Sequence, residues 1–139
     1  MDFLKRSLAP ITDEGWEEID EAAREVLSNK LTGRKVVDVV EPQGWEYQAI
    51  PQGKLDIKED NPQSVRYGIR KVLPLVETRV SFELNIWELD NLSRGAEDVD
   101  LSPLEDAAAE AAQFEENVIY NGLGEAGIEG MFPSAGSSV

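Results

Sequence analysis

The sequence predicts an α+β fold in which two long amphipathic helices accompany a hairpin and an alternating strand. The chain of 139 residues has the length of one domain, and 41% of its residues are apolar, which is enough for a buried core. Apolar residues recur at helical spacing over 13–31 and 103–121. They alternate over 53–70 and again from 76, which is typical of strands.

The first helix is expected over about 13–31. Thr12 stands where a side chain caps the first turn, and Gly33 stands where a left-handed residue ends a helix. One stripe is formed by the apolar residues Trp16, Ile19, Ala23, Val26 or Leu27, and Leu31. The segment RKVVDVV at 34–40 then predicts a short buried strand.

A projecting hairpin is expected within 49–75. Leu55 and Ile57 alternate before a polar tip, and Val65, Tyr67 and Ile69 alternate after it. A two-stranded hairpin with so little apolar content is stable mainly when something else covers it.

A clean alternation begins at Val76 and predicts a strand with one core face. That face carries Val76, Thr78, Val80, Phe82 and Leu84. Asn85 is placed to cap a short helix over about 86–93, and Gly95 to end it. Trp87, within this helix, has three interpretations: packing in the core, contact with another subunit, or a platform for a ligand.

The strongest helical signal lies over 103–121. Ser102, Pro103 and Glu105 fit a capping box, and a stripe continues through Ala107, Ala111, Phe114 and Val118. The Gly- and Ser-rich tail after it predicts either a frayed end or a chain interrupted at a loop.

Composition disfavours several classes of function. The chain has no cysteine and no histidine, so disulfides, thiolate nucleophiles, imidazole bases and the commonest zinc ligands are absent. We therefore expect neither catalysis nor a metal site. The net charge of −15 argues against nucleic acid and anionic membranes as partners, since phosphates select basic surfaces. No Lys or Arg follows Arg94, so the acidic C-terminal third is either a solvated face or the counterpart of a basic partner surface.

No apolar run reaches the length of a membrane span, and the first ten residues lack the apolar stretch of a signal peptide. A cytoplasmic location is the expectation.

Six separate blocks together resemble the encapsulins, the shell proteins of bacterial and archaeal nanocompartments that are also known as linocin-type bacteriocins. The blocks are FLKRSLAPIT at 3–12, GRKVVDV at 33–39, GWEY at 44–47, LPLVETRVSFELNIWELDNLSRG at 73–95, VDLSPLE at 99–105 and FEENVIYNG at 114–122. The resemblance implies a tailed-phage major-capsid fold, with an inner helix, an extended hairpin loop, a peripheral domain with a long spine helix, and an axial domain.

Members of that family are roughly twice as long, so the resemblance implies an N-terminal half whose missing C-terminal half is a partner. The corresponding subdivision is 1–48 for the N-terminal helix and the start of the peripheral domain, 49–75 for the extended loop, and 76–139 for the peripheral domain with its spine helix. On its own, such a half is not expected to form closed shells.

The function that the resemblance implies is assembly rather than bond chemistry. Copies close into an icosahedral cage, and a C-terminal peptide on a cargo enzyme docks on the inner wall; the cargo is a ferritin-like iron-storage protein or a dye-decolourising peroxidase. A phage or prophage capsid protein is the alternative, and a secreted bacteriocin or protease fits less well.

The resemblance also suggests sites. It places cargo-peptide docking near Phe3, Leu4, Arg34 and Asp38. Arg34 and Asp38 could equally close the junction after the first helix.

A flavin could stack on Trp87 with Arg79 beside it, as in some members of the family. Otherwise the shell is expected to carry no cofactor.

Contacts between subunits are expected on the basic hairpin, which holds five of the thirteen basic residues of the chain. They are Lys54, Lys58, Arg66, Arg70 and Lys71.

Overall fold

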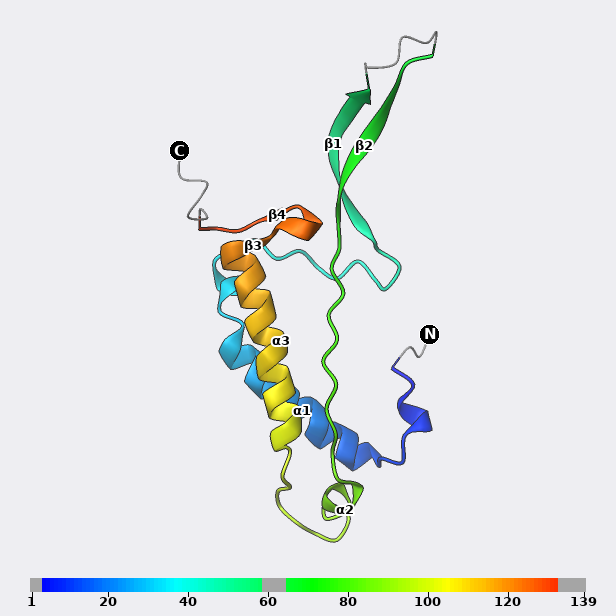
Figure 1. Ribbon diagram of the computed structural model, residues 1–139. Coiled ribbons are helices and arrows are strands. Elements are labelled where there is room, and N and C mark those ends of the chain that lie inside the picture. The colour runs from blue at the N-terminus through cyan, green and yellow to red at the C-terminus, as the bar shows by residue number, and fades with distance from the viewer. Residues whose placement is uncertain (1–3, 59–64, 133–139) are drawn as a thin grey trace. The chain divides into compact units, whose positions relative to one another are not determined.

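The computed structural model describes residues 4–58 and 65–132 (Figure 1). Its elements are η1 (Arg6–Leu8), α1 (Asp13–Lys30), η2 (Gly33–Lys35), β1 (Ala49–Lys58), β2 (Tyr67–Pro74), α2 (Ile86–Leu89), α3 (Ser102–Asn121), β3 (Gly122–Leu123), η3 (Gly124–Ala126) and β4 (Ile128–Glu129). This mixture of helix and strand confirms the α+β class. The chain forms two compact units, Met1–Val36 with Thr78–Glu116, and Val37–Glu77 with Asn117–Val139. The subdivision drawn from the resemblance stays a prediction.

Helix α1 begins and ends almost where the sequence predicted. The hydroxyl of Thr12 accepts a hydrogen bond from the backbone N–H of Gly15 at 3.0 Å, which satisfies one of the unpaired donors of the first turn. The helix ends at Lys30, and the N–H of Leu31 still donates to the carbonyl of Leu27 at 2.9 Å. The prediction of a left-handed Gly33 was wrong, because Gly33 is the first residue of η2.

The segment before α1 is tied to that helix by Arg6. Its guanidinium donates two hydrogen bonds to the carboxylate of Asp20, at 2.8 and 2.6 Å, and lies 4.6 Å from the ring centroid of Trp16. Hydrogen bonding to Arg6 holds the pKa of Asp20 below its ordinary value, although burial opposes this shift. These contacts fix η1 against the first half of α1.

The core of the first unit joins α1, α2 and the start of α3. Its buried side chains are Ile19, Leu89, Leu101 and Leu104. Partly buried residues pack around them, among them Trp16, Leu84, Ile86 and Val99. The first half of the apolar stripe predicted on α1, with Trp16, Ile19 and Ala23, therefore faces the core.

The short strand predicted at 34–40 was wrong. The N–H of Val36 closes η2 by donating to the carbonyl of Gly33 at 3.1 Å, and no strand follows before Ala49. Val36, Val39 and Val40 are 59%, 60% and 77% exposed and Val37 is half-buried, so this valine-rich run has no fully buried side chain. Apolar character alone did not make a strand, because no neighbouring strand in the described residues pairs with it.

The segment over 76–84 is extended, but it forms no ladder with a strand among the described residues. Its predicted inner face is correct in part: Val80 and Leu84 are half-buried, whereas Val76 and Phe82 are 41% and 43% exposed. The alternation thus predicted the orientation of the side chains and not the pairing.

The hairpin is confirmed as β1 and β2, which form a two-stranded antiparallel sheet (Figure 1). Its polar tip lies outside the described residues. Between the pairs Pro51–Val72 and Leu55–Arg70, three residues of β1 oppose one residue of β2, so the ladder carries a bulge. Gly53, at φ 71°, supplies the left-handed conformation that this bulge needs.

Helix α2 is capped as predicted but is shorter. The side chain of Asn85 accepts from the N–H of Trp87 at 2.9 Å, and the helix ends at Leu89 rather than near 93. A series of turns continues to Gly95, whose φ of 103° ends the segment. The interpretation of Trp87 as a core residue was wrong, because its side chain is 76% exposed.

Helix α3 differs from expectation at its start and in its buried face. Ser102 is already helical, and the carboxylate of Asp100 accepts from both its N–H and its hydroxyl, so Asp100 takes the place of the predicted cap. The buried side chains are Leu104, Ala107, Ala108 and Ala112. The predicted stripe through Phe114 was wrong there, since Phe114 is 40% exposed.

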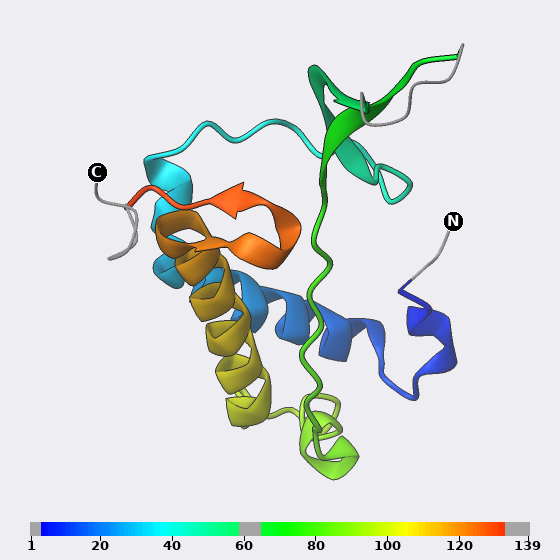
Figure 2. The same cartoon turned by 45° about the horizontal axis from the view of Figure 1, so that its top comes forward.

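After α3 the chain folds back on the end of the helix (Figure 2). The N–H groups of Met131 and Phe132 donate to the carbonyls of Ile119 and Tyr120, each at 2.9 Å, and the rings of Tyr120 and Phe132 stack at 5.2 Å. Carbonyls of the last helical turn are thereby satisfied. The predicted frayed end was wrong as far as Phe132.

The return depends on a close approach between Gly122 and Gly130. A Cβ atom on Gly130 would collide with backbone atoms of Asn121, Gly122 and Tyr120, whereas a Cβ atom on Gly124 would meet nothing within 4 Å. We predict that Gly130→Ala destabilises this return by about 1–3 kcal/mol, the usual cost of overpacking. Hydrogen exchange of the Met131 and Phe132 amides checks this, since local opening removes their protection. Gly124→Ala is the matched control; equal exchange in both variants would contradict the prediction.

Candidate functional site

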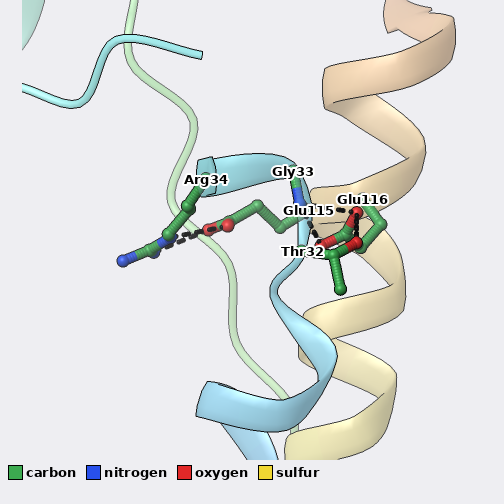
Figure 3. A network of polar contacts seen from close by, with 5 residues as sticks. All are labelled: Thr32, Gly33, Arg34, Glu115 and Glu116. Carbon is green, nitrogen blue, oxygen red and sulfur yellow. Dashed lines mark hydrogen bonds and ion pairs between the residues drawn. The ribbon is translucent and has the colours of Figure 1, made fainter. Parts of the chain in front are cut away.

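Two adjacent carboxylates of α3 hold the segment that follows α1 (Figure 3). Glu115 accepts from Nε and Nη2 of Arg34, each at 2.7 Å. Glu116 accepts from the N–H of Gly33, at 2.9 and 3.1 Å to its two oxygens, and from the hydroxyl of Thr32 at 3.2 Å. We call these five residues the η2–α3 clamp. Its paired, two-oxygen geometry fixes both distance and orientation.

Charge and burial act in opposite directions within the clamp. Hydrogen bonding to Arg34 lowers the pKa of Glu115, and hydrogen bonding to Glu115 raises the pKa of Arg34, while partial burial opposes both shifts. The two side chains are 32% and 54% exposed. Solvent screening therefore limits the pair to about 0–1 kcal/mol.

Arg34 also lines a broad hollow on the surface along α1. The hollow has an apolar floor that includes Leu27 and Leu31, and Arg24, Arg34 and Lys35 bring cations to it. Apolar anchors with a few charges beside them suit an extended peptide. This hollow is the candidate functional site of the first unit.

For the other residues predicted for docking, the structure shows, within the described residues, no contact that bears on a docking role. Leu4 is 66% exposed, and Phe3 lies outside the described residues. Asp38 is exposed and belongs to the second unit. The structure brings Arg34 together with Glu115, which supports its predicted role at the junction after α1; a docking role stays a prediction.

Three of the five basic residues predicted for the hairpin interface lie around the bulge. Lys54, Arg70 and Lys71 line a hollow there together with Leu55 and Val72. Lys58 pairs with Asp56 at 2.7 Å. Arg66 is exposed just before β2. The structure therefore groups three of the five predicted interface cations.

The predicted flavin site consists of side chains at the surface. The exposed indole of Trp87 leaves an aromatic face open, and the backbone beneath it is held by Asn85 and by Arg94, whose guanidinium donates to the carbonyl of Trp87 at 3.0 Å. Arg79 is exposed on the extended segment before α2. Flavin binding here stays a prediction.

Metal and membrane sites find no support in residues 4–58 and 65–132. This part of the chain holds no group of three acidic side chains placed to bind a metal ion. Of its helices, none is long and apolar enough to cross a membrane.

Sequence reasoning missed the two carboxylates of the clamp. They belong to the acidic C-terminal third, which the sequence left open as a solvated face or the counterpart of a basic partner surface. Both lie more than one turn before the end of α3 at Asn121, where the helix dipole has little effect, so the sequence carried no specific signal of their partners.

Comparison with known proteins identifies the family. The profile of the family described as "Encapsulating protein for peroxidase" matches residues 1–139. This chain belongs to that family. Relatives named "Type 1 encapsulin shell protein" include proteins from Mycolicibacterium paratuberculosis, 39% identical over 94% of this chain and 49% of the relative, and from Brevibacterium linens, 34% identical over 99% of this chain and 52% of the relative. A third, from Mycobacterium tuberculosis, is 37% identical over 94% of this chain and 49% of its own length.

The chain therefore spans about half the length of the curated relatives it matches. A more distant match, a "Diheme-cytochrome-encapsulin shell fusion protein" of Kuenenia stuttgartiensis, is 23% identical over 93% of this chain.

We predict that the pair Arg34–Glu115 is coupled at neutral pH and uncoupled in acid. Because the pKa of Glu115 is lowered in the folded state, the pair's contribution is present above the unfolded pKa of about 4.3 and is lost as pH falls through the lower folded pKa. A double-mutant cycle with Arg34→Ala and Glu115→Ala should give a coupling of about 0.5–1 kcal/mol at pH 7 and none near pH 2.

The matched control pairs Arg34→Ala with Glu110→Ala, an exposed carboxylate on the same helix outside the clamp. A coupling for Glu115 no larger than for Glu110 at pH 7 would contradict the prediction.

Proposed function

We propose that this chain is a structural part of an encapsulin shell. Copies assemble into an icosahedral cage that encloses a cargo enzyme, and the shell itself has no enzymatic activity. The shared family and the relatives named as type 1 encapsulin shell proteins support this proposal. The cage is a cytoplasmic nanocompartment, and neither nucleic acid nor a membrane is a partner.

The exposed apolar surface of the hairpin carries the proposal. Leu55 and Ile57 are 56% and 59% exposed, and Tyr67 and Ile69 are 54% and 55% exposed. The register of the β1–β2 ladder places Leu55 and Ile57 on one face of the sheet, and Tyr67 and Ile69 on the other. A two-stranded sheet that is apolar and exposed on both faces has the character of an interface, because soluble proteins rarely leave contiguous apolar surface uncovered.

We further propose the tailed-phage capsid fold for this chain. Helix α1 corresponds to the inner helix, β1 and β2 to the extended loop, and α3 to the spine helix. The lengths support this assignment: α1 has 18 residues, α3 has 20, and β1 has 10.

Cargo is proposed to dock as a peptide along the hollow beside α1. Arg34 lines this hollow, and Phe3, Leu4 and Asp38 are the further residues that the resemblance assigns to docking. The family description, which names a peroxidase, favours a dye-decolourising peroxidase over a ferritin-like protein as the cargo. The chemistry would belong to that enzyme, and this chain would supply the apolar floor and the cation that orient its peptide.

A flavin stacked on Trp87, with Arg79 near its phosphate, is retained as a subsidiary proposal. The open indole face supports it. A colourless native shell that takes up no added flavin would end it.

The experiment that tests the function is purification of the native gene product that contains residues 1–139. Electron microscopy should show closed particles, and mass spectrometry of their contents should show an enzyme. A product without particles would overturn the shell proposal. Particles filled with nucleic acid would favour the phage-capsid alternative.

The docking role of Arg34 is separable from its role in the clamp by a charge exchange. We predict that Arg34→Glu weakens binding of a cargo peptide roughly tenfold, as expected for loss of a charged contact. Adding Glu115→Arg restores an ion pair in the clamp and should leave binding weak if the peptide contacts Arg34 itself. Fluorescence anisotropy of a labelled peptide measures both variants, and full recovery in the exchanged pair would show that Arg34 acts only through the clamp.

A further inference from the structure

Asn121 is the one asparagine of this chain that a glycine follows. At an Asn–Gly junction the next backbone nitrogen is able to reach the amide carbon of the asparagine side chain, because glycine has no Cβ atom to crowd the approach. The side chain of Asn121 is exposed, so water has access to the junction. Asn85 and Asn91, by contrast, are followed by branched apolar residues and hold their side-chain amides in hydrogen bonds.

The reaction available at such a junction is deamidation. The backbone nitrogen of Gly122 attacks Cγ of Asn121, and the new C–N bond closes a five-membered succinimide ring. The bond from Cγ to the side-chain nitrogen breaks, and that nitrogen leaves as ammonia with the proton that Gly122 loses. Water then opens the ring at either of its two carbonyl carbons, which leaves aspartate or isoaspartate in place of Asn121. The reaction needs water and no oxidant or cofactor.

The structure holds this junction in a conformation that prevents the attack. Asn121 is the last residue of α3, and the Cβ atom of a helical residue is tilted toward the start of the helix, away from the following nitrogen. The return at 122–132 also packs on the junction (Figure 2). A Cβ atom on Gly130 would stand 2.4 Å from the carbonyl carbon of Asn121 and 2.5 Å from the nitrogen of Gly122. The peptide unit between them is therefore not free to rotate while the return is closed.

The contacts that close the return are few in the part of the chain that the structure describes. Two backbone hydrogen bonds of 2.9 Å, donated by Met131 and Phe132, and the stacking of Phe132 on Tyr120 fasten it to α3. Strands β3 and β4 add two residue pairs. A two-stranded sheet is marginally stable on its own, so the return opens by local unfolding more often than the whole chain unfolds.

We propose that Asn121 is a deamidation site that the return protects, so that the junction reacts only while the return is open. This chemistry depends on residues 119–132 and not on the shell function.

The product then keeps the return open. Aspartate places a negative charge at the C-terminal end of α3, which is the negative end of the helix dipole, and next to the ladder pair Gly122–Glu129. No Lys or Arg follows Arg94 in the sequence to offset this charge. Isoaspartate adds a carbon to the backbone where Gly122 and Gly130 leave no room for a Cβ atom. Deamidation is thus a one-way switch from the closed to the open return.

Peptide mapping by mass spectrometry tests the site in the native gene product. The protein is incubated at mildly alkaline pH, where the backbone nitrogen loses its proton more readily. Aspartate and isoaspartate should accumulate at Asn121 and not at Asn85 or Asn91, and more slowly in buffer than in urea that unfolds the chain. Asn121→Gln keeps an amide but has to close a larger ring, so it should stay unmodified. No reaction at Asn121, or equal rates there in buffer and in urea, would overturn the proposal.

Glycine variants test the protection by the return. Gly130→Ala, whose Cβ atom collides with the junction, should raise the rate of deamidation at Asn121 roughly tenfold, in proportion to the open population. Gly124→Ala, whose Cβ atom meets nothing within 4 Å, is the matched control and should react at the wild-type rate. If the two variants react equally fast, the return does not protect the junction and the proposal fails.

The effect of the product is measured separately, on Asn121→Asp. Its Met131 and Phe132 amides should exchange hydrogen roughly tenfold faster than in the wild type, because the return that protects them is open more often. Asn121→Gln, which adds no charge, is the control and should exchange as the wild type does. Equal exchange in the two variants would show that the product does not hold the return open, and the one-way switch would be wrong.

Discussion

The structure is constrained by its exposed apolar surface, which the side chains of this chain do not cover. Among the described residues, eight hydrophobic side chains are buried and 21 large ones are exposed, so a large apolar surface has no internal partner. The buried set is concentrated where α1, α2 and the start of α3 meet. Elsewhere the backbone is held by helix caps, turns, hydrogen bonds and ion pairs, and its apolar side chains are exposed and can contact another molecule.

Polar contacts supply the geometry that a small core does not. The η2–α3 clamp and the Arg6–Asp20 pair each join two segments by two hydrogen bonds or more, and both lie partly in solvent. At about 0–1 kcal/mol for each ion pair, they add little stability. These contacts instead fix the orientation of the side chains, because a guanidinium that donates two hydrogen bonds to one carboxylate cannot rotate away from it. Arg34 is thereby held in one orientation where it lines the hollow along α1.

The sequence predicted the features that depend on residues close together in the chain. It did not predict the features that depend on partners far away in the sequence. Thr12 and Asn85 cap their helices as predicted, because a cap requires only its own first turn. The strand at 34–40 and the burial of Trp87 failed because both needed a distant surface to pack against. For the candidate site, sequence reasoning selected Arg34 and the hairpin cations but missed Glu115, whose role follows only from the position of α3.

The hairpin shows how folding and assembly are linked in this chain. A two-stranded sheet is marginally stable in water, and here its ladder is interrupted by a bulge and its apolar side chains face outward on both sides. A partner that binds only the ordered hairpin stabilises it by mass action, about 2.7 kcal/mol when the partner is present at a hundred times its Kd. Under the proposed function, that partner is another subunit, so the order of the hairpin rises with subunit concentration. In that proposal, assembly stabilises β1 and β2, and the apolar surface that is exposed in a single copy is the surface through which copies associate.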